Sequence, residues 1–293
     1  MKIFITGGSG FIGRNLKEQL GDKYQVAAPA SSELNLFDED DIFEYLKKEK
    51  FDVVIHAATW NATRNSPRDT TKVLENNLKM FFNLARCRDY YGKMIYYGSG
   101  AEYDRRHWAP KMREDYFDTH VPADGYGYSK YVMRKYAEKT ENIYNLCLFG
   151  VFGKYEDWEI RFISNVCCKV LWDLPITIKQ NVLFDYLYID DLIKISEWFI
   201  KNNQGEQTYN ICTGMTYDLL TIAKKVLNVS GKDLDIVVKK EGMAPEYSGN
   251  NSKLLKQIRD HTFNNIDVSI NDLYEWYSMH RNLIDKEKLL TDK

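Results

Sequence analysis

The sequence lacks the features that mark several large classes of protein. No run of apolar residues approaches the roughly 20 needed to span a bilayer, which argues against a membrane helix. Proline is scarce, at 6 in 293 residues, and 44% of the residues are hydrophobic, which excludes a disordered or linker-like chain. Neither sign of charge dominates, since the chain has 40 Lys and Arg and 42 Asp and Glu. We therefore expect no long-range attraction to nucleic acid or to an anionic membrane.

Cysteine is also scarce and follows no pattern. The chain has 5 cysteines and no C-x-x-C pair, which is typical of reduced, buried thiols rather than of a disulfide framework. Residues 1–6 lead straight into a glycine turn, and we therefore expect no signal peptide. The 5 histidines show no metal-ligand spacing. Together these observations predict a cytoplasmic protein without a metal site.

Strand and helix patterns alternate through the first half of the chain. Amphipathic helical patterns separate short apolar strands at 2–6, 24–28, 53–55 and 93–97. This alternation predicts right-handed βαβ crossovers and thus an α/β fold of Rossmann type, with a doubly wound parallel sheet covered by helices on both faces. Further helices are expected at 126–140, 160–172, 190–201, 216–229 and 272–290.

The second half is less regular, which predicts a smaller lobe packed on the sheet domain. We assign the dinucleotide-binding domain to residues 1–159 and about 181–212. The discontinuous α/β C-terminal lobe would comprise about 160–180 and 213–293, and it would bind the substrate.

A glycine-rich turn joins the first strand to the first helix. Gly7, Gly10 and Gly13 have the spacing G-x-x-G-x-x-G. Glycine lets the backbone approach a pyrophosphate, and the helix that begins at Phe11 offers unpaired N–H groups at its N-terminus. Because a strand precedes the turn and a helix follows it, the turn predicts dinucleotide binding.

The end of the second strand, residues 27–32, contains no acidic residue. A carboxylate there would bind the ribose 2′-hydroxyl of NAD and repel the extra phosphate of NADP. With hydroxyls at Ser31 and Ser32 and a cation at Arg14, the segment favours NADP, while NAD stays possible.

Tyr126 and Lys130 stand four residues apart on a predicted helix and so share one face. An ammonium group beside a phenol is expected to lower the phenol pKa, which would let Tyr126 exchange a proton with a sugar carbonyl or alcohol. Ser99 follows the strand at 93–97, at the carboxyl edge of the sheet where ligands of open α/β sheets bind. Its hydroxyl would orient the reacting oxygen.

With these motifs the chain resembles the extended short-chain dehydrogenase/reductases that act on nucleotide sugars. The matching segments follow the family order and are 6–13, 34–38, 54–58, 75–84, 97–103, 126–130, 184–191 and 209–214. The resemblance implies a nicotinamide cofactor, a nucleotide-diphosphate sugar as substrate, and Ser99, Tyr126 and Lys130 as the catalytic set. It also implies a homodimer formed through a four-helix bundle.

The resemblance extends the expected cofactor site beyond the glycine turn. It places Asn35 and Leu36 by the adenine, Ala57 and Ala58 along the cofactor, and residues 149–151 near the nicotinamide. The residues expected to contact the cofactor are then Gly7, Gly10, Phe11, Ile12, Gly13, Arg14, Ser31, Ser32, Asn35, Leu36, Ala57, Ala58, Asn77, Tyr126, Lys130, Phe149 and Val151.

Departures from the family pattern reduce the number of reactions that this chain is expected to catalyse. The family's nucleotide-sugar dehydratases carry Asp-Glu directly after the catalytic hydroxyl residue, whereas Gly and Ala follow it here, which disfavours dehydration. The Cys and His of GDP-fucose synthases have no counterparts, which disfavours double epimerisation. Phe184 replaces an arginine that often contacts the diphosphate. The expected substrate contacts are Ser99, Gly100, Ala101, Arg161 and Lys179.

Three functions stay open on the sequence alone. The leading hypothesis is NAD(P)H-dependent reduction of a nucleotide-diphosphate 4-keto-6-deoxyhexose at C4, in deoxysugar biosynthesis for a surface polysaccharide. The second is a nucleotide-sugar 4-epimerase that uses the same three residues with tightly bound NAD. The third is a non-catalytic NADP-binding regulator, which the retention of Ser99, Tyr126 and Lys130 disfavours.

Overall fold

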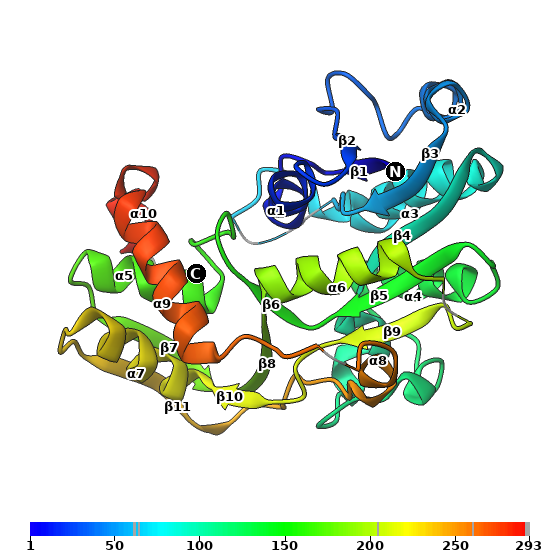
Figure 1. Ribbon diagram of the computed structural model, residues 1–293. Coiled ribbons are helices and arrows are strands. Elements are labelled where there is room, and N and C mark those ends of the chain that lie inside the picture. Colours follow the sequence, from blue (N-terminus) through cyan, green and yellow to red (C-terminus); the bar gives the residue numbers. More distant parts are fainter. Residues whose placement is uncertain (61–62, 64, 204, 260, 291–293) are drawn as a thin grey trace.

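A computed structural model describes residues 1–60, 63, 65–203, 205–259 and 261–290 of the chain. Its centre is a six-stranded parallel sheet in the order β2-β1-β3-β4-β5-β9 (Figure 1). The strands are β1 (Lys2–Thr6), β2 (Gln25–Ala27), β3 (Phe51–His56), β4 (Tyr91–Ser99), β5 (Ile143–Leu148) and β9 (Thr208–Ile211). The strand order reverses at β1, which is the pattern of a doubly wound α/β sheet and confirms the predicted fold class.

Helices cover both faces of this sheet because its strands are apolar on both sides. Ile3 and Ile5 of β1 pack into the core beneath α1 and α6, while Phe4 packs into the core beneath α2, α3 and α4. The five helices are α1 (Phe11–Leu20), α2 (Glu39–Glu49), α3 (Val73–Ala85), α4 (Gly125–Ala137) and α6 (Ile189–Lys201). Figure 1 shows α6 in front of the sheet and α3 and α4 behind it.

A second set of elements forms a lobe beside the sheet, on the left of Figure 1. It contains a three-stranded sheet in the order β10-β8-β6 and a two-stranded ribbon of β11 and β7. Its elements are β6 (Gly150–Phe152), α5 (Phe162–Leu171), β7 (Ile176–Asn181), β8 (Leu183–Tyr188), β10 (Thr216–Asp218), α7 (Leu219–Ser230), β11 (Ile236–Met243), α9 (Ile266–Met279) and α10 (Lys286–Leu289). Helices α5, α7 and α9 share one apolar core, and α8 (Ser252–Gln257) packs by β9 on the main sheet.

Two predicted helices in the C-terminal part were wrong in their bounds. Residues 216–218 form β10, and Asp218 then begins α7 by accepting a hydrogen bond from the Thr221 amide. The single helix predicted at 272–290 is instead α9, which ends at Met279, followed by the short α10. The strands β7 and β11 had no counterpart in the prediction. The boundary between the two domains stays a prediction.

Within the part of the chain that the structure describes, no helix is long and apolar enough to cross a bilayer. The five cysteines are buried and free.

Candidate active site

The glycine turn after β1 packs against the segment that follows β3. Gly7 has a φ of 71°, and a Cβ atom there would lie 2.8 Å from the backbone of Ala58. A Cβ atom at Gly13 would lie 2.1 Å from the carbonyl oxygen of Gly7. These two glycines are therefore required by the fold, because a side chain at either position collides with backbone. The contact also brings Ala57 and Ala58 to the turn, and their contact with the cofactor stays a prediction.

Gly10 differs from these two glycines because the space around it is open. It is the N-cap of α1, no side chain caps the helix, and a Cβ atom there would meet only the Gly7 carbonyl oxygen, at 3.4 Å. Exposed N–H groups at a helix N-terminus, with no side chain above them, fit the pyrophosphate of a dinucleotide. Phe11 and Ile12 pack on the core beneath the turn, so their backbone rather than their side chains faces this space.

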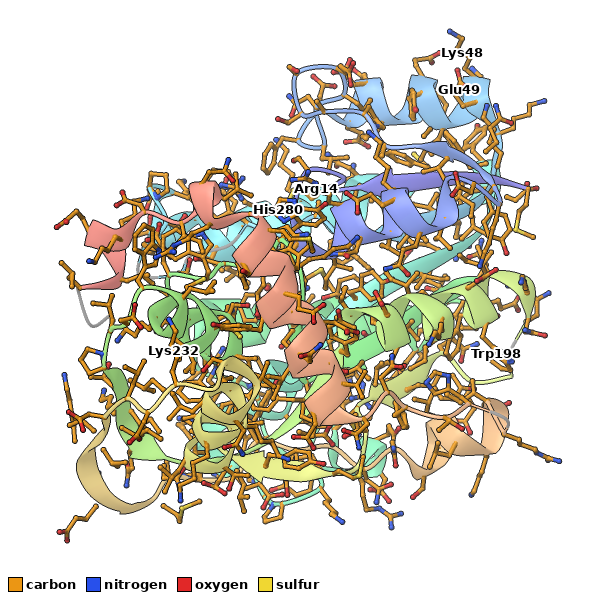
Figure 2. All side chains as sticks on the ribbon, turned by 60° about the vertical axis from the view of Figure 1, so that its left-hand side comes forward. Arg14, Lys48, Glu49, Trp198, Lys232 and His280 are labelled. Carbon is orange, nitrogen blue, oxygen red and sulfur yellow. The ribbon has the colours of Figure 1, made fainter. Side chains whose placement is uncertain are left out.

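Arg14 contacts protein groups rather than the end of β2. Its guanidinium stacks on the Tyr155 ring at 3.7 Å, and its Nε lies 3.5 Å from Glu18 Oε1. Tyr155 in turn packs edge-on against Trp276 of α9, which stacks on His280 (Figure 2, where Arg14 and His280 are labelled). A role for Arg14 at the 2′-position of a cofactor would require it to leave this stack.

The segment after β2 is exposed and polar. Ser31 and Ser32 lie on the surface, and the Glu33 carboxylate folds back to accept the Ala30 amide at 2.7 Å. Glu33 is the first acidic residue after β2 and directly follows the two serines. Glu33 thus places a negative charge on the loop where NADP would carry its extra phosphate.

Asn35, Leu36 and Asn77 shape the neighbouring loops. Asn35 Oδ1 accepts the Phe37 amide, and the carbonyl of Leu36 accepts a hydrogen bond from Asn83 of α3. Asn77 is buried, and its Oδ1 accepts the Trp60 amide at 2.7 Å, so it fixes the chain just beyond Ala57 and Ala58. These loops lie at the carboxyl ends of β2 and β3, beside the point where the strand order reverses.

Ser99, Tyr126 and Lys130 come together at the carboxyl end of β4. Ser99 is the last residue of β4, and its Oγ accepts the Ala101 amide at 3.2 Å. Asp124 caps α4 through the Gly127 amide, which starts the helix just before Tyr126. Lys130 Nζ lies 5.7 Å from the centroid of the Tyr126 ring and donates a 2.8 Å hydrogen bond to the carbonyl of Tyr97 in β4.

The pKa of Tyr126 moves opposite to the predicted direction. Burial raises this pKa above its usual value of 10, and hydrogen bonding with Ser99 offsets only part of the effect. Burial also lowers the pKa of Lys130 to about 8, partly countered by the charge of Glu102. The prediction that Lys130 lowers the pKa of Tyr126 was wrong for this state, because the ammonium bonds to the Tyr97 carbonyl and desolvation of the phenol dominates.

The predicted substrate residues Arg161, Lys179 and Ala101 lie in three different surroundings. Arg161 is exposed at the start of α5, and its positive charge lowers the pKa of Tyr126, so it lies near the phenol. Lys179 is exposed on β7 in the two-stranded ribbon, whereas Ser99 lies on the six-stranded sheet. Ala101 is only 1% exposed, so its side chain is covered, contrary to the prediction of a substrate contact.

Tyr247 was not identified from the sequence, whereas Phe149 and Val151 were predicted to contact the cofactor. Tyr247 and Trp108 lie against Gly100, and the charge of Arg105 lowers the pKa of Tyr126. Phe149 packs on Tyr247 at 5.1 Å, and Val151 of β6 packs on the core of the main sheet. No short motif joins these positions, since only the fold brings them together.

A family model and many known proteins match this chain. The model described as "NAD dependent epimerase/dehydratase family" matches residues 3–212. GDP-6-deoxy-D-talose 4-dehydrogenase from Aggregatibacter actinomycetemcomitans is 24% identical over 292 residues, 94% of this chain and 97% of that protein. dTDP-D-glucose 4,6-dehydratase from Dictyostelium discoideum is 26% identical over 271 residues, 78% of this chain, which spans 62% of that relative's length.

Solved structures share the fold along nearly the whole chain. GDP-mannoheptose C4 reductase from Campylobacter jejuni, with NADP bound, aligns with a TM-score of 0.82 at 18% identity and covers 94% of this chain and 98% of its own. UDP-glucose 4-epimerase from Thermus thermophilus, in complex with NAD, aligns with a TM-score of 0.79 at 20% identity. The alignment covers 95% of this chain and 99% of that structure's chain. Both NADP and NAD thus occur among proteins of this fold.

Proposed function

Because the chain belongs to the NAD dependent epimerase/dehydratase family, whose model matches most of it, we propose a specific activity: NADPH-dependent reduction of a nucleotide-diphosphate 4-keto-6-deoxyhexose at C4. The family makes the chain an enzyme of the extended short-chain dehydrogenase/reductase type that works on nucleotide sugars. The choice of reduction, of the 4-keto-6-deoxy sugar and of NADPH is the proposal.

One observation carries the choice of reduction. Ser99, Tyr126 and Lys130 converge at the end of β4, and neither Gly100 nor Ala101 after Ser99 offers an acid or a base. Removing water from a sugar requires a base to take one proton and an acid to protonate the leaving hydroxyl. A site with one proton-transferring phenol is sufficient for carbonyl reduction, which needs a single proton.

Each residue has a defined part in this reaction. Bound NADPH would supply the hydride to C4. The Ser99 hydroxyl holds the carbonyl oxygen, and Tyr126 donates its phenolic proton to that oxygen as the C=O bond becomes C–OH. Tyr126 is left as a phenolate, which the protonated Lys130 stabilises until solvent returns a proton. Since the pKa of Lys130 is about 8, it carries its charge at neutral pH.

The glycine turn and α1 are the proposed binding site of the cofactor pyrophosphate, and Asn35, Leu36, Ala57 and Ala58 would contact the rest of the cofactor. The open space above Gly10 supports the first assignment. Ser31 and Ser32 support NADP because their hydroxyls are exposed on the loop after β2. Arg161 is the proposed contact to the diphosphate, because its charge reaches Tyr126.

The proposal is tested by a substrate screen. Purified protein is mixed with GDP-, dTDP- and UDP-linked 4-keto-6-deoxyhexoses, and the consumption of NADPH is followed by absorbance. We expect turnover with at least one of these compounds, and a product whose C4 carries a hydroxyl by NMR. No turnover with any of them, together with interconversion of C4 epimers without added cofactor, would contradict the reductase.

A nucleotide-sugar 4-epimerase is the second candidate, and the position of Glu33 favours it. The carboxylate on the loop after β2 would repel the phosphate of NADP and suit NAD. An epimerase would retain NAD through purification, so the absorbance of the cofactor released on denaturation separates the two candidates. The homodimer stays a proposal in either case, and sedimentation of the purified protein tests it. A non-catalytic regulator would retain its cellular phenotype in a Tyr126→Phe strain.

A further inference from the structure

A cavity lies between α6 and the end of α8, on one face of the main sheet. Its volume is about 380 Å³, within the roughly 300 to 1,000 Å³ that is typical of small-molecule sites. Figure 2 labels Trp198, which lies on the side of α6 that faces α8. Tyr126 and Lys130 belong to α4, which covers the opposite face of the sheet. The cavity is therefore separate from the proposed catalytic set.

The floor of this cavity is apolar. Ile195 of α6 and Ile258 at the end of α8 are at most 4% exposed, and both belong to the core of the main sheet. Trp198 is half-buried beside them, and its ring packs edge-on against Phe199 with the centroids 5.1 Å apart. A half-buried indole offers a flat surface on which a planar ring can stack.

Positive charge surrounds this apolar floor. Lys194 and Arg259 line the cavity and are exposed, and among the described residues that line it none carries a carboxylate. Lys194 Nζ lies 3.9 Å from Oδ1 of Asp191, and both oxygens of Asp191 already accept hydrogen bonds from Asn264 at 2.9 Å. The two cations can therefore bind an anionic ligand, and a guanidinium group fits a phosphate in particular.

His261 adds a polar atom without a partner to the wall of the cavity. Its Nε2 is buried and makes no hydrogen bond with any residue that the structure describes. The distance from Nε2 to Asp191 Oδ1 is 3.9 Å, which is too long for a hydrogen bond. Burial and the charge of Lys194 lower the pKa of His261, so the ring is neutral at pH 7. Because buried polar atoms normally have a partner, His261 is a further group that a ligand can satisfy.

We propose that this cavity is a second binding site and that it takes a nucleotide, whose base stacks on Trp198 while its phosphate lies between Lys194 and Arg259. The indole, the two cations and the unpartnered His261 favour a flat anion over an apolar ligand and over phosphate alone. None of these residues is among the expected contacts of the cofactor or the sugar, so the inference goes beyond the proposed reduction.

The first test counts binding sites by calorimetry, with UMP and GMP as probes. With at least one of them, the wild type should bind one more equivalent per chain than Trp198→Ala, whether or not the catalytic site also takes the nucleotide. Arg259→Gln keeps the indole and should weaken this additional site about tenfold. The matched control is Arg281→Gln, because Arg281 is also exposed and stacks on an indole, that of Trp172, at 4.0 Å in the other lobe. It should bind as the wild type does.

Photolabelling locates the site without any substitution, so it does not depend on the folding of a variant. After irradiation with 8-azido-GMP, peptide mapping should place the label within residues 194–198 or 257–259. Label found only on peptides of the catalytic site, or equal numbers of equivalents in the wild type and Trp198→Ala, would overturn the proposal. Inorganic phosphate that binds this site as tightly as the nucleotides would also overturn the assignment of a nucleotide. Neither measurement requires turnover, so both stay decisive if no 4-ketosugar is reduced.

Discussion

Arg134 and Glu102 form an ion pair inside the protein, with Nη1 2.8 Å from Oε1 and both side chains at most 2% exposed. Asn145 donates to the same carboxylate, and Arg134 stacks on Phe117 at 3.7 Å. Arg134 lies one helical turn beyond Lys130 on α4, and Glu102 lies in the short turn that follows Ser99. Because the Glu102 charge raises the pKa of Lys130 against the effect of burial, this buried carboxylate helps to keep the proposed catalytic lysine charged.

Glu102→Gln should shift the pH dependence of activity. Lys130 acts as a cation, so activity falls as the pH rises through its pKa of about 8. Without the Glu102 charge that pKa is lower, and the fall should begin at lower pH. The variant should also lose about 3 kcal/mol of unfolding free energy, because Arg134 loses its buried anionic partner and keeps only the partly exposed Glu138. The kcat–pH profile and urea denaturation measure the two effects. Glu138→Gln removes the partly exposed partner of Arg134 and serves as the control, with an unshifted profile.

Gly10→Ala should separate cofactor binding from folding. The backbone of Gly10 has a φ of -83°, which alanine adopts, and the space above it is open. The unfolding midpoint should therefore stay near that of the wild type, while NADPH affinity measured by calorimetry should fall at least about tenfold, because a methyl group displaces the pyrophosphate. Gly13→Ala should instead destabilise the fold, since its Cβ meets the Gly7 carbonyl. Unchanged affinity in Gly10→Ala would place the pyrophosphate elsewhere.

Tyr126→Phe should abolish most of the reduction and leave the fold intact. Loss of the phenolic proton removes the general acid, which is expected to lower kcat by on the order of 10²- to 10⁴-fold. The matched control is Tyr128→Phe, because Tyr128 lies on the same helix but is 38% exposed. Steady-state kinetics on a substrate found in the screen measure both variants. A Tyr126→Phe enzyme with full activity would rule out the assigned proton donor.

Glu156 should make the protein less stable at alkaline pH. Burial raises the pKa of this carboxyl to about 8, and Ser164 donates to it at 2.7 Å. A carboxyl with a raised pKa contributes its stability below about pH 4.5, and the contribution is lost as the pH rises toward 8. Glu156→Gln should remove this slope and be more stable at pH 8 to 9 by on the order of a few kcal/mol in urea denaturation. Glu44→Gln, on the surface of α2, should leave the slope unchanged.

The regular part of the fold could be predicted because each residue pattern there is compatible with only one kind of local structure. A strand that is apolar on both faces, such as 53–55, is typical of a parallel sheet with helices packed on both sides. In a glycine turn between a strand and a helix, the close approach of the backbone leaves little room for side chains. Position 126 and position 130 meet because helical periodicity places them on one face. These local rules led to the parallel sheet, without its edge strand β9, and to the convergence of Ser99, Tyr126 and Lys130.

The remainder depends on contacts between distant segments. The strand β11 pairs with β7 across some sixty positions of sequence and is exposed along most of its length, so neither carries a strong pattern. Tyr247 reaches Gly100 only because its backbone pairs with β8. The pKa of Tyr126 could not be predicted from its spacing to Lys130, because burial of the phenol outweighs the neighbouring charge.

The stack of Arg14, Tyr155 and Trp276 joins opposite ends of the polypeptide. Arg14 belongs to the helix whose N-terminus forms the proposed phosphate seat, and Trp276 belongs to α9, the last long helix described. The N-terminal helix is therefore supported by a residue that is synthesised long after it. A nascent chain can form its glycine turn early, but Arg14 gains this support only when α9 has been made and has folded onto Tyr155.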